Sequence, residues 1–177
     1  MRSRYLFVEY SPQWPQLFHE EAQRWQMLLG DLLVKVHHVG STSVPGLAAK
    51  PVIDLLPEVS DIAQVEARTQ KIEEAGYRAW GEYGLPGRRF FTKDTGEFRT
   101  ENIHVYETGN HEIIRHVAFC AYLRDHDDDR IDYEAIKRAA YAQHPADIEG
   151  YCEFKDAWIK RVEPLAVAWF EGQPRAI

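Results

Sequence analysis

Residues 37–56, HHVGSTSVPGLAAKPVIDLL, combine residue types that can bind phosphate with one that can bind a metal ion. A turn at Gly40, Ser41 and Thr42 would expose unpaired backbone N–H groups at the end of a strand, and such a concavity favours anions. A hydroxyl at Ser41 or Thr42 adds a donor, and Lys50 adds a point charge for the same phosphate. The segment is typical of a phosphate-binding turn, although its composition is also common in ordinary turns.

Asp54 is an acid inside an otherwise apolar run. If that run returns beside the turn at Gly40, the carboxylate can bind Mg²⁺, and the ion can bridge to phosphate oxygens held at the turn. The alternative is a structural carboxylate whose oxygens are satisfied by hydrogen bonds. The two interpretations differ in whether Asp54 faces a pocket.

Periodicity and turn residues predict the elements that position these groups. Residues 34–39 predict a strand that ends at Gly40, and residues 51–59 predict a second, largely buried strand. Turn residues separate three further strands at 77–80, 88–92 and 102–106, after a short entry strand at 5–9. Helices are predicted at 16–33, 61–75, 110–126, 129–143 and 146–170, with a kink or restart at Pro164.

The order of these elements predicts the fold class. Strands and helices mix first and three helices come last, which indicates an α+β fold. The 177 residues show no internal repeat and no low-complexity linker. We therefore expect a single domain over 1–177, with a mixed α/β part at about 1–109 and a helical part at about 110–177.

Composition limits the classes of partner and location. A net charge of −7 disfavours nucleic acid and acidic membrane surfaces as partners. Glu9 interrupts any apolar signal core, and no apolar run approaches the roughly 18 residues that span a bilayer. The two cysteines, Cys120 and Cys152, fit reduced core thiols. We expect a cytoplasmic protein, and self-association into a homo-oligomer stays open.

The segment GSTSVPGLAAKPVIDLL resembles the signature of the GrpB-like family of the nucleotidyltransferase superfamily. The resemblance covers nearly the whole chain, because further motifs follow in the family's order: VEYSPQWPQLFHEE (8–21), LPGRRFF (85–91), NIHVYETGN (102–110), RHVAFCAYLRDH (115–126), YEAIK (133–137) and IEGYCEFKDAWI (148–159). It implies a mixed, largely antiparallel sheet flanked by helices, with a helical C-terminal part. It also implies a nucleotide or related phosphorylated ligand.

The sequence matches only the first half of the superfamily's acidic pattern. Twelve residues separate Ser41 from Asp54, as the pattern requires, but the alternate position after Asp54 is Leu56 instead of a second acid. Two acids at such positions lie about 7 Å apart and can share ions, whereas Glu58 is about 13 Å away along a regular strand. A second metal ligand would have to come from another strand, for example from Glu101 or His104.

Two strand residues are further candidates. His104 matches the family's histidine and could bind phosphate or a metal, or act as a general base. The alternative is a satisfied histidine on a half-buried strand. Arg88 and Arg89 must point to opposite faces of their strand. We expect Arg89 to face the cleft as a phosphate clamp, against the alternative of a plain surface charge.

Basic positions of the family's helical motifs could converge on one anion site in this acidic protein. These positions are Arg115, Arg124, Lys137 and Lys155. Taken singly, each fits a solvated or snorkelling helix charge better than a site residue. Tyr133 and Tyr151 belong either beside that site or in the core.

Together these features predict a nucleotidyltransferase-like protein that binds a nucleotide or other phosphorylated ligand with Mg²⁺. Asp54 and His104 are the catalytic candidates, and catalysis would transfer a nucleotidyl group to an unknown acceptor. The alternative is a catalytically inactive ligand-binding or folding-assistance module, related to the domain fused to dephospho-CoA kinase in some bacteria. The missing second carboxylate favours this alternative, so the sequence leaves enzymatic activity open.

Overall fold

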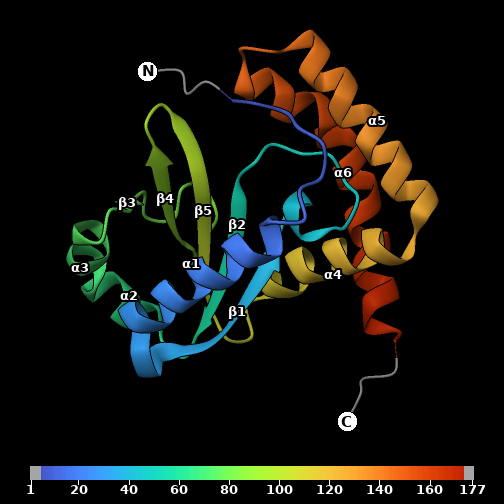
Figure 1. The fold of residues 1–177 in the computed structure, drawn as a ribbon. Helices are drawn as coiled ribbons and strands as arrows, with labels where there is room; N and C mark the ends of the chain where they lie inside the picture. The colour runs from blue at the N-terminus through green and yellow to red at the C-terminus, as the bar shows by residue number, and fades with distance from the viewer. Residues whose placement is uncertain (1–4, 174–177) are drawn as a thin grey trace.

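A five-stranded sheet forms the centre of the computed structural model, which describes residues 5–173 (Figure 1). The strands lie in the order β1-β2-β5-β4-β3, and β2 pairs with β5 in parallel while the other neighbours are antiparallel. They are β1 (Leu33–Val39), β2 (Ile53–Val59), β3 (Arg78–Ala79), β4 (Arg89–Thr95) and β5 (Phe98–Glu107). The expected α+β class with a largely antiparallel sheet is confirmed.

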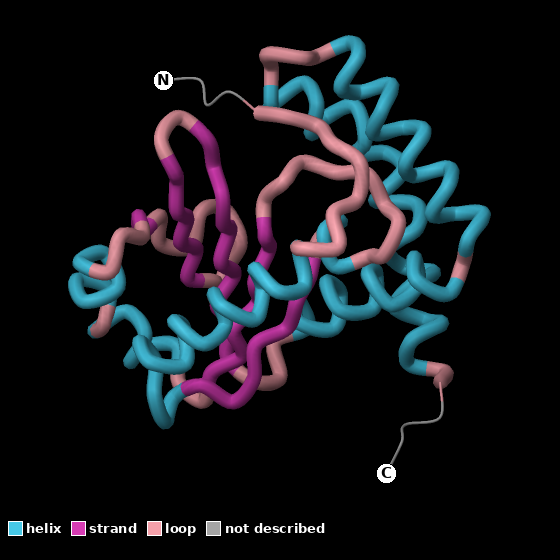
Figure 2. Tube along the Cα trace, viewed as in Figure 1, coloured by secondary structure: helices cyan, strands magenta, loops and turns pink. Residues whose placement is uncertain are grey.

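Six α-helices surround this sheet in the described part of the chain. They are α1 (Trp14–Leu29), α2 (Ile62–Ala67), α3 (Thr69–Glu74), α4 (His111–Asp125), α5 (Asp127–Gln143) and α6 (Ile148–Glu171). Short 3₁₀ turns follow α1 at Gly30–Leu32 and β1 at Ser41–Ser43. The long loop from β1 to β2 and the N-terminal segment run between the sheet and the C-terminal helices (Figure 2).

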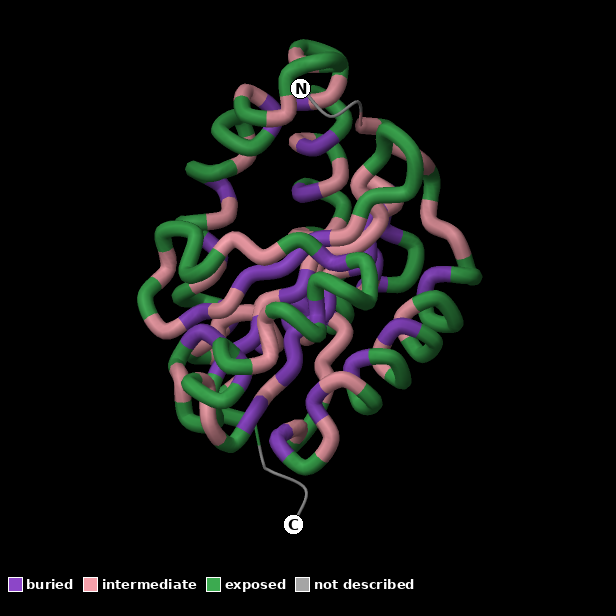
Figure 3. Tube along the Cα trace, turned by 90° about the vertical axis from the view of Figure 1, so that its left-hand side faces the viewer, coloured by how far each residue is buried: buried purple, intermediate pink, exposed green. Residues whose placement is uncertain are grey.

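Alternation along the strands gives the sheet two apolar faces and therefore two cores. Leu55 packs in a cluster with Trp25 of α1, whereas the next residue, Leu56, packs in a cluster with Trp158 of α6. Figure 3 shows the resulting run of buried residues through the middle of the molecule. Asp54 has the same parity as Leu56, so its side chain lies on the face that the C-terminal helices cover.

Several element boundaries differ from the prediction. α1 ends at Leu29 because Gly30 takes a positive φ of 55°, so the helix does not reach residue 33. The predicted helix at 61–75 is two helices that meet at Arg68. The entry strand at 5–9 is a single bridge between Val8 and Ala49.

α6 continues through Pro164 as one helix, so the chain does not restart there. Proline removes one backbone donor. Pro164 is exposed, and water can therefore replace the missing hydrogen bond on that side of the helix. The ends of the three predicted helices in the C-terminal part agree with α4, α5 and α6 to within two residues.

The loop between β1 and β2 is fastened to α4 and α5 by charged side chains. Arg124 donates to the Ser43 carbonyl at 3.0 Å, and Arg130 donates to the Pro45 carbonyl at 3.1 Å. At Ala48, the backbone N–H donates to Glu134 at 3.0 Å, and the carbonyl accepts from Lys137. The helical part therefore fixes the segment that the sequence singles out for phosphate binding.

Two sequence expectations concern cysteines and membranes. Cys120 is buried, as expected of a core thiol, but Cys152 on α6 is exposed, so the core assignment is wrong for it. Within residues 5–173, none of the helices combines the length and apolar character that crossing a bilayer requires.

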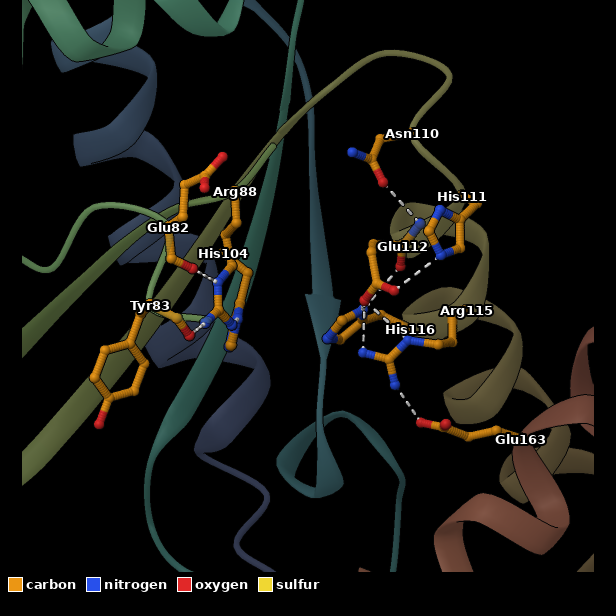
Figure 4. A network of polar contacts seen from close by, with 10 residues as sticks. All are labelled: Glu82, Tyr83, Arg88, His104, Asn110, His111, Glu112, Arg115, His116 and Glu163. Carbon is orange, nitrogen blue, oxygen red and sulfur yellow. Dashed lines mark hydrogen bonds and ion pairs between the residues drawn. The ribbon is translucent and has the colours of Figure 1, made fainter. Parts of the chain in front are cut away.

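Arg115 ties α4 to α6 and lies away from any anion site. It donates to Glu112 at 2.6 and 2.9 Å within α4 and also to Glu163 of α6 (Figure 4). The placement of this residue in a phosphate site is therefore wrong. Two carboxylates already bind its guanidinium, which raises the pKa of Arg115 against the opposing effect of burial.

We predict that Arg115→Leu lowers the free energy of unfolding by about 1–3 kcal/mol, because Glu112 and Glu163 lose a shared, partly buried partner. Chemical denaturation followed by circular dichroism measures this change. The corresponding change at the exposed Lys160, Lys160→Leu, should cost less than about 0.5 kcal/mol. Equal effects of the two substitutions would contradict the role of Arg115 as a tie between helices.

Candidate functional site

The end of β1 and the start of β2 bring the Gly-Ser turn and Asp54 together, as the sequence predicts. β1 and β2 are antiparallel, and Val39 pairs with Asp54 in their register. Gly40 comes next and opens the 3₁₀ turn at Ser41–Ser43, which is closed by the Ser43 N–H to the Gly40 carbonyl at 3.1 Å. The twelve residues between Ser41 and Asp54 thus form a connection that leaves the sheet at the end of β1 and returns to the same end of the sheet at the start of β2.

Gly40 is required at this position for two separate reasons. Its φ of 69° and ψ of 179° belong to a region that side-chain-bearing residues essentially avoid. A Cβ atom there would lie 2.9 Å from Cγ of Asp54 and closer still to one carboxylate oxygen. The missing side chain is therefore what lets the carboxylate lie against the backbone of the turn.

The carboxylate of Asp54 is held by two side chains of β5. Asn102 donates from Nδ2 to Oδ1 at 2.9 Å, and Nε2 of His104 lies 3.6 Å from the same oxygen. Burial opposes the charge of this half-buried acid, but His104, Asn102 and the charge of Lys50 outweigh burial and lower the pKa of Asp54. Asp54 is therefore an anion at neutral pH.

Arg88, which directly precedes β4, contacts His104 of β5. Its guanidinium lies 3.3 Å from Nδ1 of His104 and donates to the carbonyls of Glu82 and Tyr83 at 3.1 and 2.6 Å (Figure 4). Because arginine only donates, the Arg88 contact makes Nδ1 the acceptor and leaves the Nε2 proton to face Asp54. Burial lowers the pKa of Arg88.

Arg89, the expected phosphate clamp, lies on the other face of the sheet. It pairs with Val105 in the register of β4 and β5, and its guanidinium donates to Glu66 of α2. The choice between the two adjacent arginines was therefore wrong. Sequence alternation shows that they point apart, but only the pairing of β4 with β5 shows which one shares a face with His104.

A cavity of about 210 Å³ lies between the turn, Asp54 and the C-terminal helices. Three ammonium groups, one carboxylate and two phenols line it, and we call it the lysine cavity. Its lining consists of Gly40, Ser41, Thr42, Ala49, Lys50, Val52, Asp54, Asn102, Phe119, Tyr133, Lys137, Tyr151 and Lys155. Among these described residues Asp54 is the single acid, so the cavity is cationic within an acidic protein.

Burial affects the three lysines of the cavity unequally. Lys137 is almost fully buried, and burial lowers its pKa to about 7. Burial also lowers the pKa of Lys50, whose ammonium lies 5.4 Å from the ring centroid of Tyr151. Lys155 reaches the same ring at 5.7 Å. The aromatic faces compensate part of the hydration that these ammonium groups lose.

His38, near the end of β1, contacts the turn through Thr42. Nε2 of His38 lies 3.1 Å from the hydroxyl of Thr42, and its ring stacks on Phe18 at 4.5 Å. Burial lowers the pKa of His38 to about 4, so the imidazole is neutral at physiological pH. The hydroxyl of Thr42 is therefore already bound to His38, and Ser41 is the better-placed donor toward the cavity.

The structure brings most of the predicted site residues together. Those that line the lysine cavity are Gly40, Ser41, Thr42, Lys50, Asp54, Lys137 and Lys155. His104 contacts Asp54 without lining the cavity. Arg124 contacts the turn from outside, at the carbonyl and hydroxyl of Ser43, so its expected place inside the anion site is wrong.

Sequence reasoning missed Asn102 and Arg88 as site residues. Asn102 lies two positions before His104 on the same strand, so period-two alternation was the available signal. The sequence does not decide whether Tyr133 and Tyr151 belong to the core or to the site. In the structure both residues are buried and both line the lysine cavity. Burial raises the pKa of both phenols, which stay neutral donors.

The described residues do not offer a resident Mg²⁺ site. Glu101 pairs with Ile53, so its side chain lies on the opposite face from Asp54, and Glu58 contacts His37 at 3.0 Å. Throughout residues 5–173 no group of three His, Cys, Asp or Glu side chains is arranged to hold a metal ion. One carboxylate beside three lysines does not fit a permanently bound divalent cation.

We predict that Gly40→Ala destabilises the fold by about 1–3 kcal/mol more than Gly96→Ala. Gly96 has a similar φ of 63° and nothing within 4 Å of the position that a Cβ would take, so it controls for a positive φ without the contact to Asp54. Adding Asp54→Ala to Gly40→Ala should remove part of the excess, because the two contacts with the carboxylate disappear while the contact with Cβ of residue 54, at 3.0 Å, remains. Denaturation midpoints measure all three; equal losses at the two glycines would refute the close approach.

We predict a pH-dependent stability contribution from Lys137. Its pKa is about 7 in the folded protein and 10.5 ordinarily, so the unfolded chain binds more protons between these values. The free energy of unfolding of wild type relative to Lys137→Met should therefore rise by about 1–3 kcal/mol from pH 7 to pH 9. Urea denaturation at both pH values measures the difference, and a flat or falling difference would contradict the buried amine.

Comparisons with known proteins agree with this architecture. The family model described as GrpB protein matches residues 6–164. The UPF0157 protein YqkA of Bacillus subtilis is 41% identical over 169 residues, which cover 96% of this chain and 49% of YqkA. This chain thus spans about half the length of that relative. A dephospho-CoA kinase of Mycolicibacterium paratuberculosis is 27% identical over 187 residues, which cover 91% of this chain and 46% of the kinase.

Solved structures give the same assignment. GrpB from Enterococcus faecalis matches with a TM-score of 0.89 and 40% identity, covering 93% of this chain and 99% of that chain. The GLD-2/RNP-8 complex (TM-score 0.54, 11% identity, 90% and 58% of the two chains) and Cid1 with its product ApU (0.53, 13%, 77% and 43%) share the fold alone. The chain belongs to the GrpB family and has a nucleotidyltransferase-like fold.

Proposed function

We propose that this protein binds a phosphorylated small molecule, nucleotides included, through a phosphate in the lysine cavity. The observation that carries the proposal is the convergence of Lys50, Lys137 and Lys155 on the Gly40–Ser41 turn. Ammonium groups, a hydroxyl and strand-end N–H groups are the donors that phosphate oxygens accept from. The excess of cations over the single carboxylate favours a dianionic phosphate.

Asp54 has a positioning role in this proposal. Its carboxylate fixes the amide of Asn102 and attracts Lys50, and it can accept a hydrogen bond from a ligand hydroxyl. A carboxylate also repels a phosphate at the same point, so the phosphate belongs on the lysine side of the cavity. Binding then needs no resident metal and should persist in EDTA.

A second candidate is nucleotidyl transfer, favoured by the fold and by Asp54 beside the Gly-Ser turn. One carboxylate can hold Mg²⁺ where substrate phosphates supply further ligands, so Mg²⁺ would have to arrive with a nucleoside triphosphate. The dephospho-CoA kinase relative fits either candidate, because this domain accompanies a phosphate-handling enzyme in that protein.

We predict that Lys155→Ala weakens binding of inorganic pyrophosphate by at least about tenfold, as expected for loss of a charged hydrogen bond. Isothermal titration calorimetry in EDTA at pH 7 measures the affinity. Lys160→Ala is the matched control, because Lys160 lies on the same helix but pairs with Asp156 at the surface. The control should bind as wild type does.

Two outcomes would contradict the proposal: no pyrophosphate binding to the wild type, or equal losses in the two lysine variants. Binding that disappears in EDTA and returns with Mg²⁺ would instead favour the second candidate.

For nucleotidyl transfer, the second candidate, we expect pyrophosphate release from nucleoside triphosphates with Mg²⁺ to be lost in Asp54→Asn. Release that is unchanged in this variant would exclude Asp54 from the chemistry.

A further inference from the structure

A second cavity, of about 330 Å³, lies directly beside the lysine cavity. Lys50, Val52 and Asn102 line both, so the two spaces are neighbours across these side chains. We call the second space the outer cavity. Its size falls in the range of roughly 300–1,000 Å³ that is usual for small-molecule sites.

The two cavities differ in chemistry. Apolar and aromatic side chains make up most of the outer cavity: Tyr5, Leu6, Pro51, Val52, Phe98 and Ile148. Its arginine, Arg99, already donates to Asp94 and lies 3.3 Å from Oδ1 of Asn102. The hydroxyl of Thr100 donates its one proton to Glu101 and lies 3.3 Å from the Lys93 carbonyl. The outer cavity thus suits an apolar group, while the charged donors gather in the lysine cavity.

Lys50 and Asn102 form the boundary between the cavities. The ammonium of Lys50 lies 6.0 Å from the ring centroid of Tyr5 in the outer cavity and 5.4 Å from that of Tyr151 in the lysine cavity. The amide of Asn102 donates to Asp54 on one side and accepts from Arg99 on the other. A phosphate held by Lys50 therefore has its ester oxygen next to the apolar compartment.

The helical side of the lysine cavity is well packed. Tyr133 stacks on Trp158 at 4.7 Å, and Lys137 is bound to the Ala48 carbonyl. The remainder of a ligand whose phosphate occupies the lysine cavity can extend past Lys50, because Lys50, Val52 and Asn102 also line the outer cavity. Phe98, at the start of β5, is 37% exposed in the free protein and offers apolar surface on that route.

We infer that the ligand is a phosphomonoester that carries an aromatic group, with the phosphate in the lysine cavity and the aromatic group in the outer cavity. This inference rests on the proposed phosphate binding and adds the class of molecule attached to the phosphate. Tyr5 and Phe98 can contact the ring faces or edges, and the apolar lining excludes water around it.

The test compares inorganic phosphate, ethyl phosphate and phenyl phosphate by calorimetry. Burial of a ring should make phenyl phosphate bind at least about tenfold more tightly than inorganic phosphate, with ethyl phosphate in between. Phe98→Ala should bring phenyl phosphate to within about threefold of ethyl phosphate and leave inorganic phosphate unchanged. Ile148→Ala should act in the same direction.

Phe154→Ala is the matched control, because Phe154 is 38% exposed on α6 and lines neither cavity. It should change none of the three affinities. Inorganic phosphate that binds as tightly as phenyl phosphate would overturn the outer cavity while leaving the proposed phosphate site intact. Ethyl and phenyl phosphate of equal affinity would overturn the aromatic assignment, and the absence of all binding would overturn both proposals.

Discussion

The structure depends on one close approach, between the backbone of Gly40 and the carboxylate of Asp54. A side chain at residue 40 would overlap the acid, and the backbone there has a conformation that glycine alone adopts readily. The approach follows from the antiparallel pairing of Val39 with Asp54. With that pairing fixed, the intervening loop must turn away from the sheet, and it meets the C-terminal helices.

The helices complete the site by supplying cations that the sheet lacks. An acidic protein with a net charge of −7 concentrates Lys50, Lys137 and Lys155 around one small cavity. Removing an ammonium group from water is costly, and burial accordingly lowers the pKa of Lys50 and of Lys137. Such an arrangement is difficult to explain as packing, because an apolar residue would fill the same space at lower cost. An anionic ligand would offset the penalty, which is why the lysines point to function.

Local sequence signals predicted the α+β class and the turn beside Asp54, whereas the resemblance to the GrpB-like family implied the largely antiparallel sheet and the lysines of the helical part. The strands around Gly40 and Asp54, and the helices that follow, were visible because periodicity and turn residues act over a few positions. The placement of Arg89 failed for a different reason. Which arginine faces the cleft depends on the pairing of β4 with β5, and no local pattern encodes pairing between strands. Arg115 likewise matched a basic motif, but its partner Glu163 lies on another helix.

The most direct measurement is an anomalous diffraction map from crystals soaked in tungstate, a heavy tetrahedral dianion that substitutes for phosphate. We predict one dominant peak inside the lysine cavity, within hydrogen-bonding reach of the Gly40–Ser41 backbone and the ammonium of Lys155. Peaks at surface lysines alone, with the lysine cavity empty at saturating tungstate, would contradict the account.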